Sequence, residues 1–255
     1  MEPSNQRYRS GNRLSDRFSS LAAGCGSLEE LWTHFQNAAG ELGFDYVALL
    51  HHDSLSRPGD HYIRLDNYPE AWATELREGG LAPYDPVHRA SRVASAAFRW
   101  RNLGRLTELG ERQKTILKRS RDFGIGDGMT VPVNVPGEPA GSCSFAVRRG
   151  VKLPERQLHA AEIIGLHAFD AARRLSRAGH SRPHLSRRQV QCLRLVAAGK
   201  TDFEISLILG ISLETARQYI KSARKAYDVV ARTQLVALGL RDQWLSFDDA
   251  IHPRE

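Results

Sequence analysis

Basic and polar side chains recur at helical spacing between residues 213 and 227. Arg217 and Lys221 lie four residues apart, so one face of a helix would carry both into a DNA major groove. Arg224 and Lys225 follow where phosphate contacts are expected, because recognition helices contact bases mainly near their N-terminal end. The candidate DNA-contacting residues are Thr215, Arg217, Gln218, Lys221, Arg224 and Lys225. The plainer alternative is a small helical subdomain with a solvated basic face.

Capping signals define short helices before that basic stretch. Ser186 precedes Gln189 by three residues, which matches the capping box at a helix start, and Thr201–Glu204 repeats the pattern. Gly210 is placed to end the second of these helices. Short helices separated by a glycine-containing turn predict a helix-turn-helix domain over residues 185–250.

A second candidate site is spread over the first 175 residues, which are the part of the chain able to control a DNA-binding unit. It consists of polar and aromatic residues in apolar surroundings: Tyr68, Trp72, Asp85, Trp100, Thr130 and Ser144. Taken singly, each has a plainer explanation. Trp and Tyr are often core residues whose polar tip is satisfied locally, and Asp85 precedes a proline where it could cap the next helix.

Catalytic and metal-binding patterns are missing from the sequence. There is no G-x-S-x-G elbow and no helical H-x-x-x-H pair, and Ser144 has no base evident in the sequence. Cys25, Cys143 and Cys192 are scattered without a C-x-x-C, which argues against a disulfide framework and a zinc site. We therefore expect no enzyme activity, no catalytic residue, no cofactor and no metal site.

Composition favours a polyanionic partner and a cytoplasmic location. The 255 residues carry a formal net charge of +7, which suits nucleic acid. No stretch approaches the ~20 apolar residues of a membrane span, and the polar N-terminus lacks the apolar segment of a signal peptide. We expect no membrane partner.

Helix and strand patterns divide the chain into two domains. We expect a frayed tail over residues 1–14 and helices over 15–43, 70–78, 87–94, 105–121 and 154–177. Strand-like runs cover 44–52, 60–66, 129–135 and 141–149. The predicted fold class is α+β: an N-terminal α/β/α sandwich with an antiparallel sheet over 15–176, a linker over 177–184, and an all-α helix-turn-helix domain over 185–250.

The C-terminal segment resembles the LuxR-type DNA-binding domain. Its runs LSRRQVQCL, AAGKTDFEIS, LGISLETA and ARTQLVA follow that family's pattern over the whole of residues 185–237. Three positions depart from it: Gln189 and Gln191 replace glutamates, and Ala216 replaces a valine. A glutamine keeps the size and capping ability of glutamate but loses its charge, so the local ion pairs are expected to differ.

The N-terminal set resembles the autoinducer-binding domain of LuxR-type quorum-sensing receptors. The resemblance rests on Tyr68-Pro69-Glu70-Ala71-Trp72, then Asp85-Pro86, then Trp100, followed by Gly128. The second tyrosine of the family pattern is Leu76 here. Its loss removes a hydroxyl and a ring, which could admit a bulkier or aromatic acyl group or mark a regulator with a different ligand.

The resemblance implies an N-acyl homoserine lactone as ligand. Trp72, a pure hydrogen-bond donor, would bond the lactone carbonyl, and the Asp85 carboxylate, a pure acceptor, would bond the amide N–H. Tyr68 and Ser144 would bond the amide or acyl carbonyl, and Trp100 would pack on the lactone ring. The apolar lining expected around them is Val47, Leu49, Tyr62, Val87, Val131 and Phe145.

The expected function is a ligand-responsive transcriptional regulator that binds double-stranded DNA at a palindromic site as a homodimer. RNA polymerase is a further expected partner. The apolar stripe of residues 154–175 is a candidate dimer helix, although it could instead close the domain core. Two alternative functions are a regulator answering another small molecule or none, and a phosphorylation-controlled response regulator. The second would need an acidic pair that the first 45 residues lack.

Overall fold

The computed structural model describes residues 3–55, 62–136, 138–176 and 183–251. The chain divides into a larger unit, Met1–Val135 with Pro139–Gly179, and a smaller unit, Pro136–Glu138 with His180–Glu255. Most of the expected linker, residues 177–182, lies outside the described residues. Among the described helices, none is long and apolar enough to cross a membrane.

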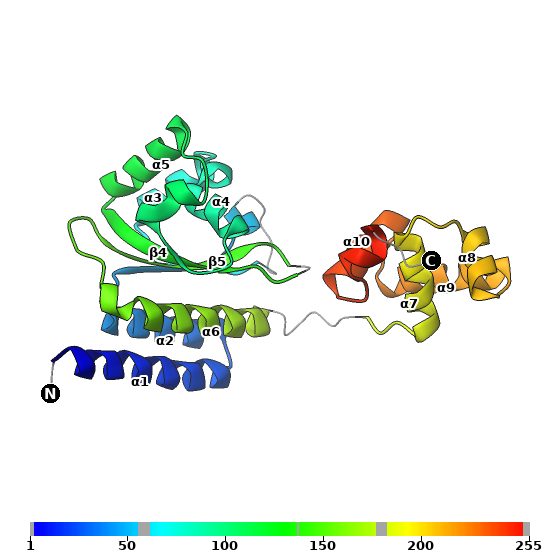
Figure 1. The fold of residues 1–255 in the computed structure, drawn as a ribbon, viewed down its shortest axis with the longest axis horizontal. Helices are drawn as coiled ribbons and strands as arrows, with labels where there is room; N and C mark the ends of the chain where they lie inside the picture. The colour runs from blue at the N-terminus through cyan, green and yellow to red at the C-terminus, as the bar shows by residue number, and fades with distance from the viewer. Residues whose placement is uncertain (1–2, 56–61, 137, 177–182, 252–255) are drawn as a thin grey trace. The chain divides into compact units, whose positions relative to one another are not determined.

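A five-stranded antiparallel sheet forms the centre of the larger unit (Figure 1). Its strands are β1 (Tyr46–His51), β2 (Arg64–Asp66), β3 (Phe98–Arg99), β4 (Ile125–Val133) and β5 (Gly141–Arg148), in the order β2-β1-β5-β4-β3. Strand β3 was not predicted, because two residues are too few to show an alternating pattern. The register pairs Thr130 with Ser144 across β4 and β5, and Ala48 with Ser144 across β1 and β5.

Helices cover both faces of the sheet, which confirms the predicted α+β sandwich. One face carries α2 (Leu28–Glu41) and α6 (Leu158–Ser176), with α1 (Pro3–Gly24) outside them; the other carries α3 (Glu70–Glu78), α4 (Pro86–Val93) and α5 (Glu111–Asp122) (Figure 1). The main core lies between the sheet and α2 and α6. There the rings of Phe35 and Phe145 meet edge to face at 5.5 Å, and both side chains are fully buried.

The apolar stripe on α6 belongs to this core. Ala161, Ile164, Phe169 and Ala172 are fully buried against the sheet and the neighbouring helices. The stripe therefore closes the domain, as the plainer alternative expected, and these side chains are not free to form a dimer contact.

The expected frayed tail over residues 1–14 is wrong, because α1 already begins at Pro3. Leu14, Phe18 and Ala22 recur every four residues and are buried in the core cluster that includes α6. The Arg174 guanidinium of α6 donates to the Ala22 carbonyl at 3.0 Å and so holds the end of α1. The first half of this helix is rich in polar residues, and for that reason the sequence pattern did not extend the helix to Pro3.

The smaller unit is all-α, as predicted. Its helices are α7 (Arg187–Ala197), α8 (Asp202–Leu209), α9 (Leu213–Ala226), α10 (Arg232–Arg241) and α11 (Phe247–Ile251). Both predicted capping boxes form, at Ser186 and at Thr201. Gly210 ends α8 with a φ of 62°, a left-handed conformation that glycine adopts without strain. Ser212 then caps α9, so the turn between α8 and α9 is short.

Candidate functional site

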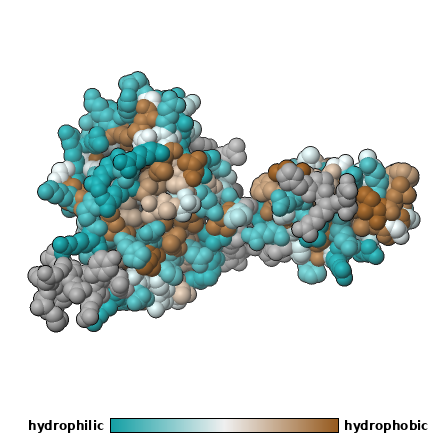
Figure 2. Space-filling model, in the orientation of Figure 1, coloured by the Kyte–Doolittle hydropathy of each residue, from teal (hydrophilic) through white to brown (hydrophobic). Residues whose placement is uncertain are grey.

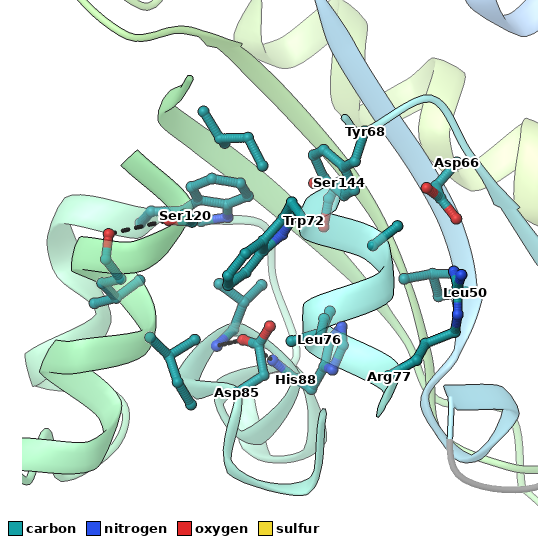
Figure 3. A pocket seen from close by; sticks show the side chains of 16 residues that line it. Leu50, Asp66, Tyr68, Trp72, Leu76, Arg77, Asp85, His88, Ser120 and Ser144 are labelled. Atoms are coloured by element: carbon teal, nitrogen blue, oxygen red, sulfur yellow. Dashed lines mark hydrogen bonds between the residues drawn. The ribbon is translucent and has the colours of Figure 1, made fainter. Parts of the chain in front are cut away.

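The side chains predicted for ligand binding come together between the sheet and helices α3–α5. Five of the six line one pocket: Tyr68, Trp72, Asp85, Trp100 and Ser144 (Figure 3). Thr130 is fully buried behind the pocket wall. Residues from α3 and the loop before it, from the N-cap of α4, from the short helical turn after β3 and from strands β4 and β5 thus meet. The chain separates them by up to 76 positions (68 to 144).

A chain of hydrogen bonds holds the wall of the pocket on the sheet. The Trp100 indole N–H donates to Thr130 Oγ1 at 2.9 Å, and Thr130 Oγ1 lies 2.9 Å from Ser144 Oγ. Gly128 lets the indole lie flat on β4, since an added Cβ there would be 2.8 Å from Trp100 Cε2. Trp100 is therefore oriented before any ligand arrives, and its donor is already used.

Asp85 serves as the N-cap of α4. Its Oδ1 accepts hydrogen bonds from the backbone N–H of Val87 at 2.7 Å and of His88 at 3.4 Å. The plainer explanation of Asp85 as a helix cap is thus confirmed. Both bonds end on Oδ1, so Oδ2 has no hydrogen bond from a described residue, and the carboxylate lines the pocket.

Trp72 and Tyr68 bring a donor and a hydroxyl to the same space. Trp72 is only 4% exposed, and no described residue accepts a hydrogen bond from its indole N–H. The Tyr68 hydroxyl lies beside Ser144, and burial raises its pKa above the usual range, so it stays protonated. The pocket can therefore bond a ligand that offers both an acceptor and an N–H.

The apolar lining differs from the expected one. Val87 lines the pocket, whereas Tyr62 is not among the lining residues and its ring meets that of His51 edge-on at 6.3 Å. Four expected residues lie in the core on the opposite face of the sheet: Val47, Leu49, Val131 and Phe145. Successive side chains on a strand point to opposite faces, so Leu50 rather than Leu49 reaches the pocket.

Several lining residues were missed from the sequence. They are Leu50, Asp66, Ala73, Arg77, His88, Ile116, Leu117, Ser120 and Ile125, and Leu76 lines the pocket with them. A partial signal existed on the helices, because Leu76 follows Trp72 by four residues and His88 follows Asp85 by three, which places each pair on one helix face. Nothing local marked the residues of α5, which reach the pocket only through the fold.

One grouping of potential metal ligands lies outside the pocket. A thiol, a carboxylate and an imidazole from Cys25, Glu30 and His34 lie within 4.8 Å of one another. The Cys25 thiol donates to the Leu21 carbonyl at 3.3 Å, and Glu30 accepts from the Gly26 N–H at 2.9 Å, so both already serve the turn between α1 and α2. Burial raises the pKa of the Cys25 thiol, whereas a metal ligand must be a thiolate. We assign no metal to these residues.

Helix α9 presents the predicted basic surface of the smaller unit. Ala216, Ile220 and Ala223 are buried on its inner side. The outer side carries exposed polar residues: Arg217, Gln218, Lys221 and Lys225. Helix α8 differs, because apolar side chains gather over it (Figure 2), namely Phe203, Leu207 and Ile208, each more than half exposed. Of these two helices, α9 is the one that carries exposed cations.

Three of the candidate DNA contacts have partners within the unit, and one of them is Arg217, whose Nε lies 3.9 Å from Asp202. Thr215 is half-buried, and its hydroxyl lies 2.8 Å from that of the helix cap Ser212. The Arg224 guanidinium is half-buried and donates to the Val230 carbonyl, which closes the turn after α9. Arg224 thus has a structural contact that the helical spacing did not predict.

Comparisons with known proteins agree with this architecture. Residues 27–175 match the family described as "Autoinducer binding domain", and residues 183–238 match "Bacterial regulatory proteins, luxR family". The chain is 26% identical over 230 residues to the transcriptional activator protein TraR of Agrobacterium vitis, covering 89% of this chain and 96% of TraR.

Solved structures share the fold. A crystal structure of Escherichia coli SdiA has a TM-score of 0.72 at 23% identity and covers 90% of this chain and 97% of that one. SdiA in complex with octanoyl-rac-glycerol has a TM-score of 0.69 at 23% identity, covering 95% and 96%. The chain therefore belongs to the LuxR family of bacterial regulatory proteins, which are transcriptional regulators and not enzymes, and it carries an autoinducer-binding domain ahead of its helix-turn-helix DNA-binding domain.

Proposed function

We propose that the pocket binds an N-acyl homoserine lactone. The observation that carries this proposal is a pair of unused hydrogen-bonding groups, the Trp72 N–H and Asp85 Oδ2, on residues that are only 4% and 8% exposed. Both residues line the pocket, so these groups are open to a ligand inside it. A ligand with a carbonyl oxygen and an amide N–H would satisfy both groups, and an acyl homoserine lactone has both.

The other polar groups of the pocket suit the rest of this ligand. The hydroxyls of Tyr68 and Ser144 can bond the amide or acyl carbonyl, and the Trp100 ring offers a flat face to the lactone. The acyl chain would lie among apolar side chains, which include Leu76, Ile116, Leu117 and Ile125. Apolar walls with a few placed polar groups are typical of small-molecule pockets.

The size of the cavity bears on how such a ligand enters. The cavity volume is about 50 Å³, whereas small-molecule pockets usually enclose at least ~300 Å³. We infer that helices α3–α5 adjust around the ligand or fold with it. Ligand binding would then add to the free energy of folding, by ~2.7 kcal/mol at a hundredfold excess over Kd.

We also propose that the protein binds a palindromic DNA site as a homodimer. One helix-turn-helix contacts one half-site, and a two-fold dimer matches two half-sites ~10 bp apart. The exposed side chains of Arg217, Gln218 and Lys221 support base contacts, and Lys225 supports a phosphate contact. RNA polymerase is a further proposed partner, and the DNA target places the working protein in the cytoplasm.

Co-purification tests the ligand proposal directly. The full chain is expressed with a panel of acyl homoserine lactones, purified, and examined by mass spectrometry for bound lactone. Soluble yield and melting temperature should rise with the bound lactone, and Trp72→Phe, which keeps the ring shape and loses only the donor, should retain less of it. A wild-type protein that retains no lactone and melts at the same temperature with and without it would contradict the proposal.

A second candidate is an acyl ligand with a different head group. SdiA has been solved in complex with octanoyl-rac-glycerol, which has no lactone ring. In this chain Leu76 stands in place of the second tyrosine of the family pattern and lines the pocket, so one hydroxyl is missing. Including acylglycerols in the same panel distinguishes the two, because only one class should co-purify and raise the melting temperature.

A further inference from the structure

Further polar side chains line the pocket besides those assigned to the head group of the ligand. Arg77, Asp66 and His88 all line it, and Figure 3 shows the Arg77 side chain extending from α3 towards Leu50 on β1 and Asp66 on β2. A pocket built only for an alkyl chain would have apolar residues there. These three side chains therefore require an explanation beyond the head group of the ligand.

The Arg77 guanidinium is the most informative of them. The residue is half-buried, and no described residue forms an ion pair or a hydrogen bond with its guanidinium. The nearby Glu75 carboxylate is already held by Arg119, with contacts of 2.7 and 2.6 Å. A guanidinium stays charged in proteins and offers five donors in a planar fork that matches a carboxylate. An unpaired one on a pocket wall is suited to an acceptor on the ligand.

His88 adds a second unsatisfied group. The residue is 8% exposed, and its Nδ1 is buried without a hydrogen-bond partner among the described residues. Its ring stacks on His52 at 4.6 Å, and the Nδ1 of His52 likewise has no partner. The other nitrogen of His52 lies 3.0 Å from Ser142 Oγ. Burial holds the pKa of His52 near 2, so the His52 ring is neutral and does not repel the Arg77 guanidinium.

Asp66 does not neutralise Arg77 through a direct ion pair. Burial raises the pKa of Asp66, and the backbone hydrogen bond from Tyr68 and the charges of Arg77 and Arg64 oppose this only in part. The positive charge of Arg77 remains for the ligand.

We infer that the acyl group of the ligand carries a carboxylate at its far end, bound by Arg77 with His88 beside it. This inference rests on the proposed function, since it concerns the tail of the same lactone. A carboxylate accepts two parallel N–H bonds from a guanidinium, which a terminal methyl group cannot do. A plain alkyl tail would give the Arg77 fork no acceptor and would leave the buried His88 Nδ1 unpaired.

Three lactones with acyl chains of equal length test this inference on the full-length protein. One chain ends in a methyl group, one in a carboxylate, and one in the methyl ester of that carboxylate. Titration calorimetry gives the affinity of each for the wild type, for Arg77→Met and for Arg77→Lys. Arg121→Met on α5 is the matched control, because Arg121 is exposed and does not line the pocket.

We expect the wild type to bind the carboxylate about ten- to a hundredfold more tightly than the ester, the range of one charge-assisted hydrogen bond. Arg77→Met should abolish this preference, Arg77→Lys should keep part of it, and Arg121→Met should keep all of it. A wild type that binds the methyl-ended lactone as tightly as the carboxylate would overturn this inference and leave the proposed function standing. Binding of none of the three would overturn both. If Arg77→Met does not fold, the wild-type ranking alone decides.

Discussion

Polar side chains that line the pocket are buried or half-buried, whereas those on the outer side of α9 are exposed. In the pocket, Trp100, Thr130 and Ser144 bond one another at 2.9 Å; on α9, Arg217 and Lys221 extend into solvent. Losing the partner of a buried polar group costs about 1–3 kcal/mol, while exposed ion pairs contribute ~0–1 kcal/mol. Substitutions in the pocket should therefore change folding and ligand binding together, and substitutions on α9 should change DNA binding alone.

The largest effect is expected for Asp85→Ala, because the carboxylate both caps α4 and lines the pocket proposed to bind the ligand. Loss of the cap should cost about 0.5–2 kcal/mol of stability, and loss of the ligand contact about 1.5–3 kcal/mol of binding. Asp85→Asn keeps a capping oxygen, so it should preserve the melting temperature while weakening lactone binding about tenfold or more. Thermal unfolding with and without lactone measures both. Equal melting temperatures for the Ala and Asn variants would contradict the capping role.

The next effect is a pH dependence that belongs to the larger unit. Burial, and secondarily the charge of His88, lower the pKa of His52 from 6.5 to about 2. The unfolded chain then binds this proton more readily than the folded one. The stabilisation from keeping His52 neutral in the folded state is complete above pH 6.5. It is lost as the pH falls towards 2, by about 1.4 kcal/mol per pH unit.

Urea unfolding at about pH 7.5 and about pH 5.5 tests this for the wild type and for His52→Gln, which cannot take up the proton. The wild type should lose about 1 kcal/mol more than the variant between the two pH values. If the wild type and His52→Gln lost the same free energy of unfolding, His52 would not be the cause of this pH dependence.

On the DNA side, Arg217→Ala should weaken the cognate palindrome by about 1–3 kcal/mol and flatten its preference over mutated sites. Its Nε lies 3.9 Å from Asp202, which Arg232 already holds at 2.5 Å. Removal of Arg217 thus leaves Asp202 paired, and the melting temperature should hardly change. Titration against the palindrome and a scrambled duplex measures the effect. Matching losses on both duplexes would rule out a base contact.

The smallest effect is expected for Lys225→Ala, an exposed cation near the end of α9. All DNA should bind slightly less well, and the slope of log affinity against log salt should become shallower by about one unit. The same two duplexes at several salt concentrations give this slope. Lys114→Ala on α5, which removes a cation paired with Glu111 in the other unit, should not alter it. A loss confined to the palindrome would show that Lys225 contacts bases.

The sequence determined most of the smaller unit because the signals there are local. A capping box needs residues only three positions apart, and those at Ser186 and Thr201 form as predicted. Gly210 ends a helix through its own backbone conformation. The buried and exposed sides of α9 also follow from spacing alone. Even so, the contact between Arg224 and the Val230 carbonyl depends on how the chain turns after α9, which helical periodicity does not describe.

The pocket was only partly determined by the sequence. The family spacing singled out Tyr68, Trp72, Asp85 and Trp100, and all four line one pocket. Of the two other residues predicted with them, Ser144 lines the pocket and Thr130 does not. Which apolar residues join them was decided by strand register, because a shift of one position exchanges the two faces of a strand. Arg77, His88 and the α5 residues enter the pocket through packing of α3–α5 on the sheet. Such contacts join residues distant in sequence, and no local propensity encodes them, so only the tertiary structure could bring them together.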